Sequence, residues 1–378
     1  MAHGSGGSES ALLTREIFGK RFANDTLDRL EDAAVLALPA SDGRPRDVPG
    51  GERRVVVSTD SFVVTPLEFA GGDIGKLAVY GTVNDVLMMG GEPGYLTCGF
   101  ILEEGLEIAT LDRIVSSMAV AAASAGVTIV AGDTKVVERR AGSEAAPGMF
   151  INTTGIGFLR ERVARGAVVA PSAASARRGD VVMVSGSIGD HHACILSARL
   201  GVENAIKSDC AALDDVVDAL YGAKPGRGDR GRAHPPARVQ GQAPRETNEP
   251  KDGVEVHVMR DVTRGGLATV LNEIAEASGV LIELDEESIP VTEEVRAFCG
   301  VMGLDPLYMG NEGKMVVIVR DEDAPEALAA MRKTEHGRDA RIIGRVGNTG
   351  DSGLVIKTRI GGTRRAASLR GEGLPRIC

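Results

Sequence analysis

Strand-like and helix-like segments alternate along most of this chain, and glycines stand at many of the junctions. In the first half we expect strands at 54–64, 94–102, 127–131 and 149–159, and helices at 72–89 and 110–125. In a second block we expect strands at 181–185, 280–284, 315–319, 340–346 and 353–358, and helices near 190–200, 264–278 and 323–333. Alternation of this kind is typical of the α/β class, in which helices cover a sheet.

A length of 378 residues suggests two domains of ordinary size. The stretch near 160–178, rich in Ala, Ser, Arg and Gly, is the expected boundary. We therefore place the domains at 1–165 and 166–360, followed by a mobile tail over 361–378. Residues 223–253 are rich in Pro, Gly and Arg and poor in apolar side chains, so we predict a disordered surface insertion there. Its arginines could contact an acidic partner, but a solvated linker is the simpler interpretation.

Composition disfavours several classes of function. A formal net charge of −10, no Trp, 4 Tyr and 8 Phe argue against nucleic-acid binding. The polar N-terminus and the lack of a long apolar run argue against a leader and against a membrane span. The five cysteines show no paired spacing, which suits a reducing, cytoplasmic location.

The sequence ends on Cys378, so no backbone follows this thiol. Pro375 fixes its own φ just before it. Residues 361–373 are polar and Gly-rich, as expected of a mobile tether. A cysteine on such an arm could enter one active site and then reach another protein, whereas a frayed tail would explain it in a random chain.

Five aspartates stand in similar local settings. Asp60 and Asp133 are expected at strand ends and Asp261 just before a helix, which is where α/β folds place ligand-binding groups. Asp85 lies in an apolar helix, where burying a carboxylate is costly unless it is paired or metal-bound. Each could alone be a cap or turn residue. Together with Asp32 they favour one Mg²⁺ site, because Mg²⁺ bridges carboxylates to substrate phosphates.

Residues that could bind phosphate are less distinctive, because the chain has no Walker A loop and no dinucleotide-binding glycine pattern at a strand–helix junction. Backbone amides of small residues can approach anionic oxygens. The candidates of this kind, with one neighbouring arginine, are Gly4, Ser5, Gly6, Gly7, Thr263, Arg264, Gly265 and Gly266. Lys135 adds a point charge. Glu312, in an Asn-Glu-Gly-Lys run, adds a carboxylate for proton transfer, although an ordinary turn is equally consistent with that run.

Motifs spread over nearly the whole chain, apart from 223–253, point to one family. They are Ala2–Gly7, Ser58–Ser61, Gly75–Leu77, Asn84–Val86, Cys98–Leu106, Gly132–Val137, Ile151–Thr153, Val184–Gly186, Ser208–Ala211, Arg260–Asp261, Thr263–Gly266, Asn311–Lys314 and Leu374–Cys378. In these motifs the sequence closely resembles the HypE family of hydrogenase maturation proteins. That family belongs to the superfamily of aminoimidazole ribonucleotide (AIR) synthetase, selenophosphate synthetase and thiamine-phosphate kinase. The aspartates are shared across the superfamily, whereas the Pro-Arg-Ile-Cys ending is specific to HypE.

The resemblance implies a two-domain PurM-like fold, in which the N-terminal half dimerises through its sheet and ATP binds in the cleft between the halves. It also implies a carbamoyl dehydratase: with ATP, an S-carbamoyl group on the terminal cysteine becomes a thiocyanate, and ADP and phosphate are released. The carbamoyl group would come from the carbamoyltransferase HypF. The cyanide would go to the iron of a NiFe hydrogenase through the HypC–HypD scaffold complex.

The resemblance also implies roles for individual residues. Cys378 would be the carrier, and Glu312 and Lys135 would serve proton transfer and charge stabilisation. Asn84 would join the candidate phosphate-binding residues in binding the nucleotide. The implied ligands of Mg²⁺, which would neutralise charge on the transferring γ-phosphoryl group, are Asp32, Asp60, Asp85, Asp133 and Asp261.

Some positions depart from the family pattern, and other classes of function stay open. Glu31 stands where many relatives have a second Asp, which leaves it uncertain as a ligand, and His192 stands where a small residue is more usual. A synthetase acting on a diffusible substrate would share the aspartates but would need no terminal cysteine. The selenium enzymes place a reactive residue near the N-terminus, whereas the first cysteine here is Cys98. A non-catalytic adaptor would have no need of Asp85 or Lys135.

Overall fold

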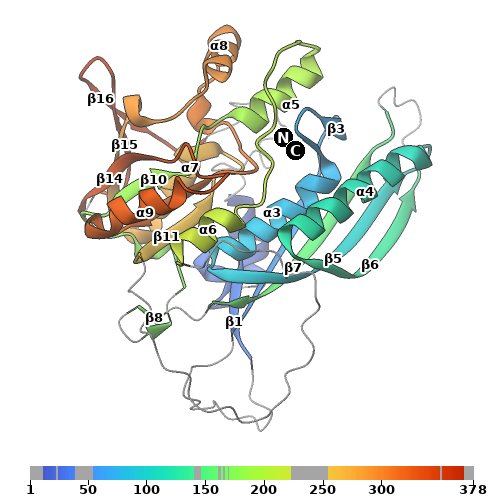
Figure 1. The fold of residues 1–378 in the computed structure, drawn as a ribbon, viewed down its shortest axis with the longest axis horizontal. Helices are drawn as coiled ribbons and strands as arrows, with labels where there is room; N and C mark the ends of the chain where they lie inside the picture. Colours follow the sequence, from blue (N-terminus) through green and yellow to red (C-terminus); the bar gives the residue numbers. More distant parts are fainter. Residues whose placement is uncertain are drawn as a thin grey trace.

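The computed structural model describes residues 12–22, 24–38, 54–139, 146–160, 163–164, 167–168, 170–222, 254–349 and 351–369. These residues form two α/β halves that lie side by side (Figure 1). The predictions for Gly4, Ser5, Gly6 and Gly7, for the 223–253 insertion and for Cys378 lie outside the described residues.

A five-stranded sheet of order β1-β2-β7-β5-β6 forms the N-terminal half. Its strands are β1 (Ala34–Ala37), β2 (Arg54–Phe62), β5 (Gly91–Glu103), β6 (Thr128–Val137) and β7 (Met149–Leu159). Only β5 and β6 run parallel to each other. The helices α3 (Ile74–Met88) and α4 (Ile108–Ala125) cover one face of this sheet (Figure 1). We call this the helix face and the opposite one the open face.

A seven-stranded sheet of order β11-β13-β10-β14-β12-β15-β16 forms the C-terminal half, with only β12 and β15 parallel. Its strands are β10 (Val181–Val184), β11 (Val256–Asp261), β12 (Val280–Asp285), β13 (Met315–Val319), β14 (Arg341–Thr349), β15 (Gly353–Lys357) and β16 (Thr363–Ala366). Because successive side chains alternate between the faces, β10 sends Val182 and Val184 toward α7 (Gly266–Ser278). It sends Val181 and Met183 toward α6 (Asp214–Leu220) and α9 (Ala324–Met331).

The remaining elements are short or lie outside the sheets. They are η2 (Thr14–Gly19), α2 (Lys20–Phe22), η3 (Leu27–Arg29), β3 (Glu68–Phe69), β4 (Gly72–Asp73), β8 (Val163–Ala164), β9 (Ala167–Val168), η4 (Ala173–Ser175), α5 (Asp190–Leu200), η5 (Glu286–Ser288), α8 (Glu293–Met302), η6 (Pro306–Tyr308) and η7 (Asp321–Asp323).

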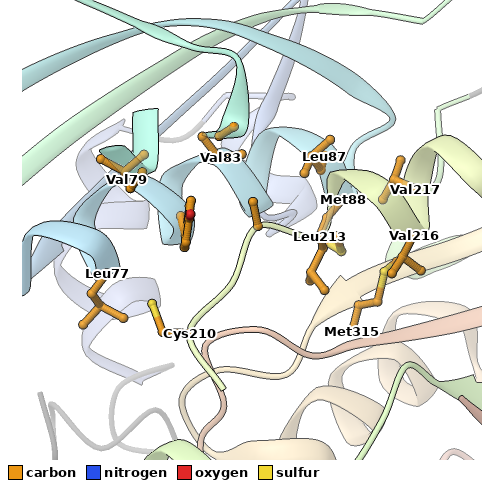
Figure 2. Packing of buried hydrophobic residues seen from close by; sticks show 14 of the residues in the cluster. Leu77, Val79, Val83, Leu87, Met88, Cys210, Leu213, Val216, Val217 and Met315 are labelled. Atoms are coloured by element: carbon orange, nitrogen blue, oxygen red, sulfur yellow. The ribbon is translucent and has the colours of Figure 1, made fainter. Parts of the chain in front are cut away.

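Helix α3 lies at the boundary and joins the two halves. The Asp73 side chain accepts a hydrogen bond from the Lys76 amide at 2.9 Å and so caps the start of the helix. Nearly every side chain of α3 is buried, because it packs on the N-terminal sheet and also on the C-terminal half. Figure 2 shows this second contact, in which α3 meets α6 and the start of β13. The residues labelled there are Leu77, Val79, Val83, Leu87, Met88, Cys210, Leu213, Val216, Val217 and Met315.

Helix α4 is apolar for a related reason. Among the described residues it is the one helix whose length and composition would allow it to cross a membrane. In this structure Ile114, Met118 and Ala121 form a buried stripe, and the helix packs beside α3 over the sheet. Packing in the helix layer therefore accounts for its composition.

Two structural findings differ from the sequence predictions. Strand β6 continues to Val137, so Asp133 lies in the middle of a strand and the prediction that it ends one is wrong. Residues 363–366, predicted as mobile tether, pair with β15 as β16, and the Arg365 side chain binds Asp351 and the Ser352 carbonyl. The prediction of a mobile tether is therefore wrong for this strand. The domain boundary at 165/166 falls between the two sheets and stays a prediction.

Candidate functional site

Four of the five predicted aspartates and Glu312 meet at the boundary between the halves. We call them the acidic cluster: Asp32, Asp60, Asp85, Asp261 and Glu312. Burial raises the pKa of Asp85 well above its usual range, and the negative charges of Asp261, Asp32 and Asp60 raise it further. Burial also raises the pKa of Glu312 well above its usual range, and the negative charges of Asp261, Asp209 and Asp60 raise it further. The cluster therefore holds several carboxylates close enough to destabilise one another's charged forms.

Strand β2 positions two polar side chains against α3. Alternation along this strand sends Val56, Ser58, Asp60 and Phe62 to the helix face. The Ser58 hydroxyl donates a hydrogen bond to Asp85 Oδ2 at 2.5 Å. Burial also raises the pKa of Asp60, although nearby Arg264 counteracts it. The strand and the helix thus bring Asp60 and Asp85 to the same edge of the boundary.

The turn between β11 and α7 supplies the C-terminal side of the cluster. Asp261 is the last residue of β11, and burial raises its pKa to about 6. Thr263 Oγ1 lies 3.3 Å from Asp261 Oδ1 in a hydrogen bond, and the Arg264 guanidinium lies 3.8 Å from Asp60. Gly266 has a φ of +65°, and a Cβ on it would lie 2.5 Å from the Tyr308 carbonyl carbon. Only glycine fits this sharp start of α7.

Asp32 is bound by an arginine of the C-terminal half. Its Oδ1 forms a buried ion pair with Arg260 Nε at 2.6 Å. Burial nevertheless raises the pKa of Asp32 to about 8, although Arg260 pulls it down. Asp32 Oδ2 is buried and has no hydrogen-bond partner among the described residues. The neighbouring Glu31 accepts hydrogen bonds from Ser172 Oγ and from the Ala173 amide, so its carboxylate is already engaged.

The donor set of the cluster suits a divalent cation that is shared with a substrate. No three described His, Cys, Asp or Glu side chains are arranged to hold a metal ion by themselves. Mg²⁺ commonly takes only one or two carboxylates and completes its shell with water and phosphate oxygens. Buried carboxylates with raised pKa values and the unpartnered Asp32 Oδ2 are groups that such an ion would neutralise. The residues present therefore fit Mg²⁺ bound together with phosphate.

Asp133 and Lys135 do not join the acidic cluster within this chain. They pair with each other at 2.7 Å on β6, and both side chains are 68% exposed. The lysine is the main reason that the pKa of Asp133 is lowered. Along one row of the sheet Asp133 pairs with Gly99, Gly99 with Asn152, and Asn152 with Ser61. This row belongs to the open face, whereas Asp60 lies one residue away on the helix face.

Asn84 forms a tie between the halves. Its Nδ2 donates to the Ala211 carbonyl at 3.0 Å, and its Oδ1 accepts from the Leu213 amide at 2.9 Å. Both polar atoms are thus engaged by the backbone of the other half. The predicted part of Asn84 in binding a nucleotide stays a prediction.

Sequence reasoning gave no role in the site to Ser58, Arg260 or Asp209, although all three lie in motifs that carry the family resemblance. Arg260 had a recognisable local signal, because it is a charged residue directly after the apolar pair Val258 and Met259. Ser58 had no local signal, since a serine in a strand is common. Asp209 binds the Glu312 amide at 3.0 Å, a contact that only the fold shows.

Comparisons with known proteins show the family to which the two halves belong. The family described as "AIR synthase related protein, N-terminal domain" matches residues 30–159, and its C-terminal counterpart matches 177–357. A carbamoyl dehydratase HypE from Cupriavidus necator is 45% identical over 380 residues, covering 100% of this chain and 94% of that protein.

Two solved structures are similar over nearly their whole length. A HypE–HypF complex matches with a TM-score of 0.76 at 40% identity, covering 94% of this chain and 99% of that one. A hydrogenase maturation protein HypE in complex with ATP matches with a TM-score of 0.72 at 43% identity, covering 100% of this chain and 98% of that one.

Proposed function

Since the chain belongs to the HypE family of carbamoyl dehydratases, built from the two AIR synthase-related domains, we propose that its acidic cluster is where ATP activates the carbamoyl group. The observation that carries this proposal is the convergence of carboxylates from both halves, Asp60 and Asp85 from one and Asp261 and Glu312 from the other. A related HypE has been solved in complex with ATP, and we propose that the triphosphate binds at the acidic cluster here.

The reaction asks two things of the chain's own residues. An amide oxygen is a poor leaving group, so the γ-phosphoryl group is transferred to the carbamoyl oxygen, which then departs as phosphate. The amide nitrogen gives up both protons as the C≡N bond forms, leaving a thiocyanate, ADP and phosphate. Glu312 is the proposed proton acceptor, because burial and neighbouring carboxylates raise its pKa and so make it a stronger base.

Mg²⁺ would neutralise negative charge on the transferring phosphoryl group. Asp32, Asp60, Asp85 and Asp261 are the residues that would hold it together with the phosphate oxygens. The Arg264 side chain, which lies beside Asp60, is the proposed contact to a phosphate. Cys378 is the proposed carrier of the one-carbon unit, and Gly4, Ser5, Gly6 and Gly7 are proposed to approach the phosphates.

We also propose that two copies associate through the open face. Exposed apolar side chains on that face support this, namely Tyr95, Ile101, Val137 and Phe158. Strand β6 adds a sheet edge that is exposed along its whole length. Asp133 and Lys135 lie on the same face. Their proposed roles, binding Mg²⁺ and stabilising charge, would therefore be carried out at the interface with the second copy.

Family membership supports further proposals about partners and location. One relative forms a complex with HypF, and we propose HypF as the source of the carbamoyl group here. The HypC–HypD complex is the proposed acceptor of the cyanide. Cys98, Cys194, Cys210 and Cys299 are free and buried, which suits the proposed cytoplasmic location.

The change Asp85→Asn tests the role of the cluster. It keeps the shape of the side chain and its hydrogen bond from Ser58 but removes one negative charge. Mg²⁺-dependent ATP turnover should fall on the order of 100-fold, equivalent to about 3 kcal/mol of charge stabilisation. The melting temperature should stay the same or rise, since like charges no longer repel. The exposed Asp112→Asn on α4 is the matched control. Normal turnover with a much lower melting temperature would show that Asp85 is structural.

A further inference from the structure

Residues 208–213 lie between α5 and α6, form no helix or strand and contact both halves. We call them the strap. One side of the strap is fixed to the N-terminal half. The Ser208 amide donates to the Ala70 carbonyl at 2.8 Å, and Asn84 binds the backbone of Ala211 and Leu213. Cys210 and Leu213 are buried beside α3, as Figure 2 shows. The strap is therefore anchored to the helix that carries Asp85.

The other side of the strap holds Glu312 by its main chain. The Glu312 amide donates to Asp209 Oδ1 at 3.0 Å, and the Glu312 carbonyl accepts from the Ala211 amide at 3.3 Å. The contact is so close that a Cβ on Gly313 would lie 2.0 Å from the Asp209 carbonyl oxygen. Both polar backbone groups of Glu312 are thus bound by one short segment.

Asp209 is itself held by a buried partner. Its Oδ2 lies 3.3 Å from Lys314 Nζ, and the two side chains are only 4% and 14% exposed. Burying an ion pair seldom adds stability, because desolvating the two charges cancels most of their attraction. A geometric role explains the pair better, since Asp209 and Lys314 bracket the residue whose position matters.

The Glu312 carboxylate needs such restraint. It lies in a field of like charge from Asp261, Asp209 and Asp60, which repels it. A base that is misplaced by about 1 Å loses on the order of 100-fold in rate. The strap opposes this displacement from the main-chain side.

We propose that Asp209 is a positioning residue for Glu312, and that the strap fixes the Glu312 carboxylate relative to Asp85 on α3. This inference rests on the proposed role of Glu312 in proton transfer. Asp209 touches neither the nucleotide nor the carbamoyl group in this account. Its contribution is the acceptor that it offers to the Glu312 amide.

Two double variants isolate that hydrogen bond. Asp209→Asn with Lys314→Met removes both buried charges but keeps an oxygen that can accept from the Glu312 amide. Asp209→Ala with Lys314→Met removes the charges and the acceptor together. Neither leaves an unpaired buried charge, so their difference reports the hydrogen bond alone.

The measurement is the rate of single-turnover dehydration of the carbamoylated protein after Mg²⁺–ATP is added. Intact-mass spectrometry monitors the loss of one water. The alanine variant should react about 10- to 100-fold more slowly than the asparagine variant, with the ATP concentration for half-maximal rate unchanged. Equal rates in the two variants would overturn the proposal, and so would a change confined to that ATP concentration. Glu312→Gln tests the proposed role of Glu312 separately from that of Asp209. If this variant reacts at the normal rate, Glu312 is not the proton acceptor, whatever the Asp209 variants show.

Hydrogen exchange in the unaltered protein gives a second readout that does not depend on a variant folding. The Glu312 amide should be protected to the same degree as the Met315 amide in β13, because both hydrogen bonds, to Asp209 and to Ser185 Oγ, are fixed. Exchange of the Glu312 amide at the rate of an exposed loop would overturn the proposal.

Discussion

Asp85 illustrates how the proposed binding role of a single residue would come at the expense of the free energy of folding. It sits on a helix whose other side chains are almost all apolar and buried, and three further carboxylates lie near it. Among the described residues, the Ser58 hydroxyl donates a hydrogen bond to its carboxylate. An arrangement of this kind is unfavourable until a cation arrives, which is why mutating it should affect turnover far more than stability.

His257 contributes to stability in a way that depends on pH. Its Nδ1 lies 2.7 Å from Asp180 and its Nε2 lies 3.2 Å from Glu255, and the hydrogen bond to Asp180 raises the pKa of the histidine. A raised pKa means that the folded state favours protonated His257. This stabilisation is complete below the unfolded pKa of about 6.5 and is lost as pH rises through the folded value.

We predict that His257→Gln lowers the free energy of unfolding by about 3 kcal/mol at low pH, because it breaks a buried ion pair. The difference from the unaltered protein should shrink as pH rises, and urea titrations across the neutral range would measure it. His336→Gln is the control, since His336 pairs with Asp215 with a third of its side chain exposed. A difference that grows toward high pH would contradict the assignment.

Sequence patterns could predict part of the site at this scale. Asp85 was recognisable as a candidate ligand, because burying a carboxylate in an apolar helix is costly unless it is paired or metal-bound. The separation of Asp133 from the cluster was not recognisable, because it depends on which face of the sheet each side chain occupies. That face is fixed by the register of three neighbouring strand pairs, which no local pattern encodes.

Among the elements, the N-terminal sheet has an unusual surface. Its open face exposes apolar side chains, and β6, which carries Asp133 and Lys135, forms an exposed edge. The longest strands and helices were predicted from period and length, whereas the 10-residue α8 was not. Strand β11 was not predicted, because His257, Arg260 and Asp261 interrupt its apolar pattern, and α6 was missed because it is only 7 residues long.

The open face gives a prediction about association. Ile101→Glu places a charge on the face that also exposes Tyr95, Phe158 and Val137, and it should convert a dimer into a monomer, because burying an unpaired charge is costly. Size-exclusion chromatography with light scattering measures the change. Val120→Glu, at an exposed apolar position on α4, is the matched control and should leave the mass unaltered. If Ile101→Glu stays dimeric, the copies associate elsewhere.

At the scale of the whole molecule, α3 and the strap bind the two halves together, and the acidic cluster lies where they meet. A carrier cysteine must reach this cluster from the end of the chain. An α-carboxylate beside Cys378 would be anionic at neutral pH. We therefore expect entry into the cluster to be unfavourable until Mg²⁺ and ATP change the local charge.

This expectation predicts slower alkylation of Cys378 when Mg²⁺ and ATP are present. The four other cysteines are buried, and replacing them gives a protein that reports Cys378 alone. Labelling should slow with saturating nucleotide, since binding shifts the tail toward the cleft. Asp85→Asn in the same background is the control, because weaker nucleotide binding should reduce the effect. Labelling that is unchanged at saturating ATP would rule out docking gated by nucleotide.

We propose that this chain dehydrates a carbamoyl group on its own Cys378. The decisive measurement is intact-mass analysis with HypF, carbamoyl phosphate, Mg²⁺ and ATP. We expect a gain of one carbamoyl group followed by the loss of one water. We also expect no change of either kind in Cys378→Ala, and a stop at the carbamoylated mass in Asp85→Asn. Both mass changes in Cys378→Ala, or a normal second step in Asp85→Asn, would contradict this proposal.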